Sequence, residues 1–343
     1  MARVSAFSKE GYWIGDIRAA TVRTWTLAST GVYGRCNFDM SKLDPKTRSK
    51  YLDFGKYVLV REANLPDWIG VIYTDQSWRH GDMTVKAWQA EKILKWRPTP
   101  ADELIAGEAG ELFREILTIT NENPYNEKRI IPNEIFDGGT IREETLGDDA
   151  LSHIQSIAER SGNDFNVVHA FDVNGRLYLK GNWYERLGAD LDDWLREGHN
   201  IEYVDDILNI KGDLYNEVMG YMDASTKGTR GRFTMRDDAA IARWGYYGTS
   251  KVFSGVSQQT TLEENTLDEL LKTVQGQSSL KLNALNVGDN YMSLRIGNSR
   301  PLDLNGAGFE GDGYGYSSRV RILGMTRDDL VDRVELAVEV IDA

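Results

Sequence analysis

The segment of this 343-residue chain that most resembles a ligand-binding motif is rich in glycine. Residues 306–311 read Gly-Ala-Gly-Phe-Glu-Gly and match the G-x-G-x-x-G pattern that holds the pyrophosphate of dinucleotides. That pattern needs a strand before it and a helix after it. Residues 312–316 are turn-like and lead into a predicted strand. We therefore interpret the glycines as a hairpin loop and predict no cofactor and no cofactor-binding residue.

Seven pairs of identical adjacent acids, Asp–Asp or Glu–Glu, are the next candidates. A glycosidase needs two carboxylates that face each other across a sugar. Adjacent side chains point apart on a strand and about 100° apart on a helix, so adjacency does not indicate such a pair. We interpret the acids as helix starts, where they complement the helix dipole, or as solvated faces. The pairs are Glu143–Glu144, Asp148–Asp149, Asp192–Asp193, Asp205–Asp206, Asp237–Asp238, Glu263–Glu264 and Asp328–Asp329.

Histidine and cysteine give no stronger signal. His80, His153, His169 and His199 lack the spacing of metal ligands, so we predict no metal site. His153 lies between apolar positions of a predicted helix, which favours a half-buried structural role. Cys36 lies in a predicted strand, where an inert buried thiol is expected. The sequence has neither a G-x-S-x-G elbow nor a complete S-x-x-K motif set, so we predict no catalytic residue and no enzymatic activity.

Tryptophan is concentrated in the first hundred residues. Exposed tryptophans would form a sugar-binding platform, whereas buried ones would fill a β core or a subunit interface. Their positions within predicted strands favour the core or interface, and the platform remains an alternative. The six residues are Trp13, Trp25, Trp68, Trp78, Trp88 and Trp96.

Composition limits the possible classes of protein. Apolar residues make up 41% and charged residues 27%, which are globular values that allow several cores. The net charge of −13 argues against binding to nucleic acid or anionic lipid, but it allows an acidic bore through which DNA slides. A single cysteine permits no intrachain disulfide, which fits synthesis in the cytoplasm. We find no signal-peptide run and no apolar stretch long enough to span a membrane.

Hydrophobic periodicity predicts a β-rich beginning of the chain. Short strand-like runs with frequent turn signals suggest a small closed barrel. Residues 64–67 are predicted to turn between two paired strands, and a short helix follows before Pro98. The predicted runs are residues 16–22, 25–27, 35–40, 57–61, 68–73 and 83–88, and the helix covers residues 90–96.

The middle of the chain is mixed and its end is β again. Helices are predicted over residues 102–120, 148–162, 237–244 and 265–274, with an irregular polar segment at 121–147 and a loop at 222–236. Asp172-Val173-Asn174-Gly175 predicts a hairpin turn between residues 165–171 and 176–180. Further strands are predicted at residues 200–209, 214–221, 280–285, 291–296, 318–325 and 334–340. The two β ends are expected to lie side by side.

The order of these segments resembles the tail hub proteins of siphophages, whose longer members are called tail-associated lysins. The resemblance rests on residues 37–44, 52–60, 68–72 and 85–91 near the start of the chain. It continues through residues 195–201, 214–218, 237–248, 266–274 and 280–283 and ends with the strands at 318–325 and 334–340. It covers nearly the whole chain in order and spacing, although each motif is short.

The resemblance implies a mainly β fold with an α+β middle region and two tube-like β-barrel domains. Residues 1–100 would form the first barrel, residues 101–260 the mixed region and residues 261–343 the second barrel. Three copies would form a pseudo-sixfold ring that matches the sixfold tail tube. The implied partners are the distal tail protein ring, the tail tube and tape measure proteins, and tip or fibre proteins, with DNA passing only through the lumen.

The location implied by the resemblance is the tail tip of the virion. Lysin-type hubs carry a long carboxy-terminal extension, whereas this sequence stops at Ala343, so we expect a hub without its own hydrolase. The loops at residues 222–236 and 306–315 are expected to reach neighbouring subunits. Two alternatives remain open: a cell-wall-degrading enzyme, which would need opposed carboxylates in a cleft, and a secreted sugar-binding module, which would need exposed tryptophans.

Overall fold

The computed structural model describes most of the chain, and its secondary structure is mainly β, as predicted. Strands account for 49% and helices for 21%. The described residues are 2–342 except for 29–32, 42, 48, 74–76, 80–81, 125, 139–141, 211–214, 223–230, 254–258, 275–277, 286–289, 305–315 and 329–332. Backbone packing divides the chain into two compact units: unit 1 contains Met1–Asp205 and Lys281–Ala343, and unit 2 contains Asp206–Leu280.

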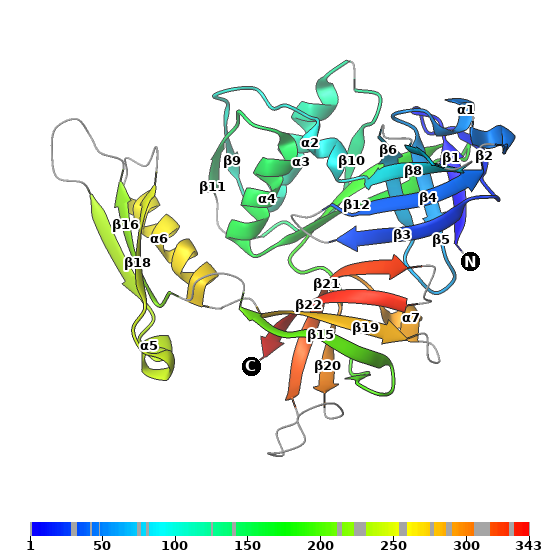
Figure 1. The fold of residues 1–343 in the computed structure, drawn as a ribbon. Helices are drawn as coiled ribbons and strands as arrows, with labels where there is room; N and C mark the ends of the chain where they lie inside the picture. Colours follow the sequence, from blue (N-terminus) through cyan, green and yellow to red (C-terminus); the bar gives the residue numbers. More distant parts are fainter. Residues whose placement is uncertain are drawn as a thin grey trace. The chain divides into compact units, whose positions relative to one another are not determined.

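The amino-terminal β region of unit 1 is antiparallel (Figure 1). It contains β1 (Arg3–Phe7), β2 (Trp13–Asp16), β3 (Thr21–Ala28), β4 (Arg35–Ser41), β5 (Tyr57–Arg61), β6 (Trp68–Ile72), β7 (Ser77–Arg79) and β8 (Asp82–Gln89). Three short helices accompany them: η1 (Pro45–Thr47), α1 (Ser49–Leu52) and α2 (Lys92–Lys95). The turn predicted at residues 64–67 is confirmed, because Val60 pairs with Trp68. The single run predicted at residues 16–22 is wrong, because the Ala20 amide closes a turn onto the Ile17 carbonyl between β2 and β3.

The carboxy-terminal β region returns to the same unit. Its strands are β14 (Leu195–Arg196), β15 (Ile201–Ile210), β19 (Ser278–Leu285), β20 (Ser299–Leu304), β21 (Tyr316–Asp328) and β22 (Arg333–Asp342). The strand predicted at residues 291–296 is wrong, since the short helix α7 (Asn290–Ser293) begins this segment. Tyr291 of α7 and Leu294, which directly follows the helix, are both buried, and their spacing of three residues places them on the same side of the chain.

The two β regions meet in one sheet. Strand β21 pairs with β3, with Met325 opposite Leu27 and Asp328 opposite Thr24. Among the described residues the sheet follows the order β15-β19-β22-β21-β3-β4-β8-β6-β5-β1-β2, with β7, β14 and β20 attached to it. The prediction that the two β ends lie side by side is therefore confirmed. The described strand pairings leave this sheet open and do not close either region into a barrel.

The mixed region follows the first β region along the chain. It contains β9 (Leu104–Gly107), α3 (Ala109–Glu122), β10 (Ile130–Ile135), β11 (Arg142–Thr145), α4 (Ala150–Ser161), β12 (Asp164–Phe171) and β13 (Leu177–Tyr184). The helix predicted from residue 102 begins only at Ala109, because a capping box between Glu108 and Glu111 fixes its start. The prediction that residues 121–147 are irregular is wrong in part, because this segment contains strands β10 and β11. The helix predicted at 148–162 and the hairpin turn at 172–175 are confirmed.

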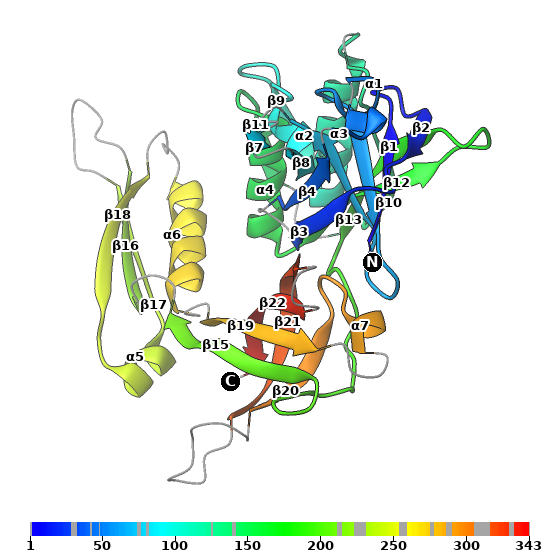
Figure 2. The same ribbon diagram turned by 45° about the vertical axis from the view of Figure 1, so that its right-hand side comes forward.

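One hydrophobic core joins the mixed region to the first β region. Helices α3 and α4 lie side by side (Figure 2) and bury Phe113 and Ile154. The Phe113 ring lies 5.2 Å from that of Trp183 on β13. Leu59 of β5 and Ile69 of β6 belong to the same core. The mixed region therefore folds against the first sheet and shares its apolar contacts.

Unit 2 is a small sheet covered by one helix. It contains β16 (Glu217–Met222), β17 (Arg232–Arg236), α5 (Asp238–Trp244), β18 (Gly248–Phe253) and α6 (Gln259–Val274). The strands follow the order β17-β16-β18, with β16 antiparallel to β17 and parallel to β18. The loop predicted at 222–236 is wrong in part, because strand β17 forms its end. The helices predicted at 237–244 and 265–274 are confirmed. Throughout the described part of the chain, each helix is too short or too polar to cross a bilayer.

Candidate functional site

Among the described residues, those first considered for chemistry do not form a reactive site. Cys36 is fully buried in β4, and its burial raises the pKa of the thiol far above its ordinary value, as expected for an inert side chain. The glycine-rich segment at residues 306–311 lies outside the described residues. Among the residues that the structure does describe, no group of three or more His, Cys, Asp and Glu side chains has the arrangement of a metal site.

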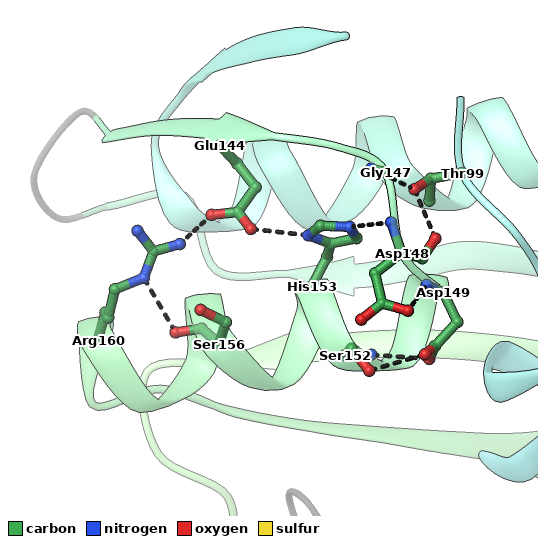
Figure 3. Close-up of polar contacts among 9 residues, drawn as sticks. All are labelled: Thr99, Glu144, Gly147, Asp148, Asp149, Ser152, His153, Ser156 and Arg160. Atoms are coloured by element: carbon green, nitrogen blue, oxygen red, sulfur yellow. Dashed lines mark hydrogen bonds and ion pairs between the residues drawn. The ribbon is translucent and has the colours of Figure 1, made fainter. Parts of the chain in front are cut away.

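One buried cluster resembles a catalytic dyad (Figure 3). His153 on α4 has its Nδ1 atom 2.8 Å from Oε1 of Glu144 on β11. Its Nε2 atom accepts a hydrogen bond of 3.1 Å from the Asp148 amide, so Nδ1 carries the proton and donates to Glu144. Arg160 forms an ion pair with the other carboxylate oxygen.

This dyad is structural because both ring nitrogens are engaged within the fold. A general base needs a free nitrogen within hydrogen-bond distance of its substrate. In this cluster the nitrogen opposite the carboxylate is already held by the backbone that leads into α4. The predicted structural role of His153 agrees with this geometry. Glu144 is buried beside the histidine, so the prediction of a helix start or solvated face is wrong for this acid.

Asp149 shows the expected role of an acid at a helix start. Its Oδ1 atom accepts a hydrogen bond of 3.0 Å from the Ser152 amide and so caps α4. Lys95 donates to its other oxygen at 2.6 Å. Burial alone would raise the pKa of Asp149, but the bonds from Lys95 and Ser152 together hold it below its ordinary value. Asp237 caps α5 in the same way through the Ala240 amide.

Replacing the cap that Asp149 provides to α4 is a first test. Asp149→Ala is expected to lower the free energy of unfolding by about 1 kcal/mol, because the first turn of α4 loses its acceptor. Asp149→Asn keeps an acceptor at the cap and should cost less, so it is the matched control. Urea denaturation measures both. Equal losses in the two variants would contradict a capping role.

The tryptophans divide between core and surface. Trp25 and Trp68 are fully buried, which confirms the core interpretation for these two. Trp88 is half-buried and stacks on Tyr73 at 4.7 Å. Trp13 and Trp96 are exposed.

The joint between the two β regions contains a buried ion pair. Arg327 of β21 is 4% exposed, and its Nη2 atom donates to Glu62 Oε1 at 2.9 Å. Its Nε atom donates to both carboxylate oxygens at 3.1 and 3.2 Å. Nη1 donates to the carbonyls of Asp328 and Arg333, both at 3.1 Å. The guanidinium thus connects the loop after β5 to the hairpin of β21 and β22.

A second buried arginine stabilises the carboxy-terminal region. Arg300 of β20 is 1% exposed and forms an ion pair with Asp193, one of the adjacent acids considered above. Its Nε atom donates to the Asp193 carbonyl at 3.1 Å. The buried charges of this fold therefore serve connections between segments that are distant in sequence. None of the clusters described above is suited to catalysis. The candidate functional feature is instead the joined set of β regions that these buried charges connect.

Comparison with a family model decides the relationship. The model described as YQBQ-like, a phage-type family, matches residues 23–314. The chain belongs to the YQBQ-like family. Comparison with curated protein sequences gives no significant match.

Solved structures show which fold this YQBQ-like chain has. The 43 kDa tail protein of prophage MuSo2 from Shewanella oneidensis superposes with a TM-score of 0.64 at 13% identity, covering 98% of each chain. Prophage tail protein gp18 from Listeria monocytogenes gives 0.60 at 13% identity, covering 99% of this chain and 94% of its own. A tail protein from Neisseria meningitidis gives 0.59 at 11% identity, covering 98% and 96%. The YQBQ-like chain therefore has the fold of phage tail proteins, and the predicted relationship is confirmed.

Proposed function

We propose that this protein is a structural hub at the tip of a phage or phage-like tail. Three copies form a pseudo-sixfold ring that caps or extends the tail tube and joins it to distal tail and tip proteins. The observation that supports this most is the pairing of β21 with β3, which brings the first and last β regions into one continuous sheet. A chain with two β regions side by side can present two similar surfaces per copy, and threefold symmetry then yields six.

The finer architecture is part of the same proposal. Residues 1–100 and 261–343 act as two tube-like β domains around the ring, and residues 101–260 form the mixed region beside them. Tube-like closure comes from neighbouring subunits, since an open sheet leaves strand edges available for pairing. The lumen passes DNA without binding it, because a net charge of −13 disfavours contact with phosphates.

The partners and the location follow from this role. The ring meets the distal tail protein ring, the tail tube and tape measure proteins, and tip or fibre proteins, and it resides in the virion after synthesis in the host cytoplasm. The protein carries out no catalysis. The engagement of both nitrogens of His153 within the fold supports this, as does the burial of Cys36.

Imaging of the particle tests the proposal. Electron microscopy of tails from a phage that encodes this chain should place three copies at the distal end of the tube, and antibody labelling should mark the same end. Native mass spectrometry of particles dissociated under mild conditions should release a species of three times 38.7 kDa. Density for this chain along the tube, or an isolated chain that binds and cleaves cell-wall sugar, would refute the proposal.

A further inference from the structure

Arg97 and Lys128 are two neighbouring cations that lack a carboxylate partner among the described residues. Arg97 follows α2, and its Nη2 atom donates a hydrogen bond of 3.3 Å to the backbone carbonyl of Lys128, in the segment between α3 and β10. Both residues are half-buried. The guanidinium is therefore held beside a residue that itself carries a positive charge, and no ion pair with a described residue balances either one.

Burial makes these two charges costly. It lowers the pKa of Arg97, and Tyr57 is the only described titratable group whose charge acts in the opposite direction. Burial also lowers the pKa of Lys128, and the charge of Arg97 contributes to the same shift. A buried cation ordinarily has an anion beside it, because desolvation without a partner destabilises the charged form.

The two acids whose charges act on Lys128 have other partners. Both raise its pKa, but burial outweighs them, and the pKa stays below its ordinary value. Glu127 forms an ion pair of 3.0 Å with Lys9. Glu10 is hydrogen-bonded to the Ser8 hydroxyl. Neither acid forms an ion pair with Lys128, so an anion from outside the chain would have no bound carboxylate to displace there.

The hydroxyl of Tyr57 adds a third donor. Tyr57 of β5 is 3% exposed, and the Lys128 Nζ atom lies 5.5 Å from the centre of its ring. Burial raises the pKa of this hydroxyl, which therefore keeps its proton, while the charges of Arg97 and Arg176 act in the opposite direction. The hydroxyl makes no hydrogen bond with a described residue. A guanidinium, an ammonium and a hydroxyl group with unused donor capacity are therefore near one another.

This set of donors matches an oxyanion with two negative charges. The buried Arg327 has a carboxylate partner in Glu62. The buried Arg300 has one in Asp193. Arg97 has no such partner among the described residues, and its guanidinium presents the parallel N–H groups that suit phosphate and carboxylate oxygens. A phosphate dianion would balance both cations and has oxygens for all three donors, whereas a carboxylate carries only one charge.

We propose that Arg97, Lys128 and Tyr57 form a binding site for a tetrahedral oxyanion with two negative charges, such as a phosphate group. The bound anion would supply the counter-charge that the two cations lack, and it would connect α2, β5 and the segment before β10. Its source is either free phosphate or the terminal group of a larger phosphomonoester. The inference goes beyond the proposed hub and does not depend on it, because all three residues belong to unit 1 of a single chain.

Titration of the full chain with inorganic phosphate tests this site. At an ionic strength held constant with potassium chloride, phosphate should raise the midpoint of thermal unfolding and reach saturation. Arg97→Met and Lys128→Met should each weaken binding by about tenfold or more, because each removes a charged donor. Tyr57→Phe removes only the hydroxyl and should weaken it by about threefold. Arg114→Met, the control, removes the same charge from an exposed position of α3 and should leave binding within about twofold.

Stability in phosphate-free buffer separates binding from a structural role. Lys128→Met should unfold at the same temperature as the wild type or at a higher one, since methionine removes a desolvated charge that has no ion-pair partner among the described residues. A cation that stabilised the fold would instead cause a clear loss on the same replacement. Circular dichroism verifies that each variant is folded.

The outcomes decide the inference as follows. Saturable phosphate binding that both methionine variants weaken, with the control unchanged, supports it. An equal effect of phosphate and chloride, binding that is unchanged in both methionine variants, or acetate that binds as tightly as phosphate overturns it. So does a Lys128→Met chain that is clearly less stable than the wild type without phosphate. Adenosine 5′-monophosphate distinguishes the two sources, because binding at least as tight as that of phosphate indicates a phosphomonoester and weaker binding indicates the free ion.

Discussion

Arg327→Ala is expected to lower the free energy of unfolding by roughly 3–5 kcal/mol, which is the cost of leaving a buried charge without its partner. The Glu62 side chain is 9% exposed, so water cannot replace the guanidinium that it loses. The carbonyls of Asp328 and Arg333 would each lose the hydrogen bond from Nη1 as well. Thermal and urea denaturation of the isolated chain measure the effect.

An exposed ion pair provides the control. Arg114 and Asp137 are 45% and 57% exposed, and Arg114→Ala should cost less than about 1 kcal/mol. The double variant Glu62→Gln with Arg327→Met removes both charges and should recover part of the stability lost in the single variant. If Arg327→Ala costs no more than Arg114→Ala, the ion pair does not hold the two β regions together.

The strands that could be predicted from sequence are those in which one face is buried. β4 alternates buried Cys36, Phe38 and Met40 with less buried neighbours, and this alternation is visible in the residue types. Residues 104–105 could not be predicted as a strand, because their apolar side chains also fit the helical periodicity of α3, which follows them. They pair instead with Thr145 and Glu144 of β11, a contact that local periodicity does not contain.

The connections between regions could not be predicted in the same way. Glu62 and Arg327 are separated by 265 residues, and neither lies in a motif. One signal was present: Arg327 lies two residues after buried Met325 and therefore shares the inward face of β21. A charged residue at an inward position requires a buried partner, but only the folded sheet identifies Glu62 as that partner.

A second buried acid was not singled out from sequence, and it makes the stability of the protein depend on pH. Glu91 precedes α2, and its Oε1 atom accepts a hydrogen bond of 3.0 Å from the Val167 amide of β12. Its Oε2 atom has no partner among the described residues. Burial raises the pKa of Glu91 from 4.5 to about 7. The folded chain therefore retains a proton that the unfolded chain releases between these two values.

The sign of the effect follows from this difference in protonation. Below pH 4.5 both states hold the proton, and the stability associated with the neutral acid is fully present. As the pH rises toward 7, the unfolded state loses its proton first, and the free energy of unfolding therefore falls. Above pH 7 both states are ionised, and the loss is complete, at about 3 kcal/mol for a shift of this size.

Glu91→Gln should remove this dependence. Glutamine is neutral at every pH and retains an oxygen for the Val167 amide, so the variant should match the wild type near pH 4.5. It should be more stable by about 2–3 kcal/mol at pH 8. Glu115→Gln on the exposed face of α3 should change the stability by less than about 0.5 kcal/mol at both pH values. Urea denaturation of the three proteins at the two pH values measures the differences. An equal difference between Glu91→Gln and wild type at both pH values would show that the pKa of Glu91 is not raised in the folded chain, because the difference changes with pH only where the folded and unfolded chains have different pKa values.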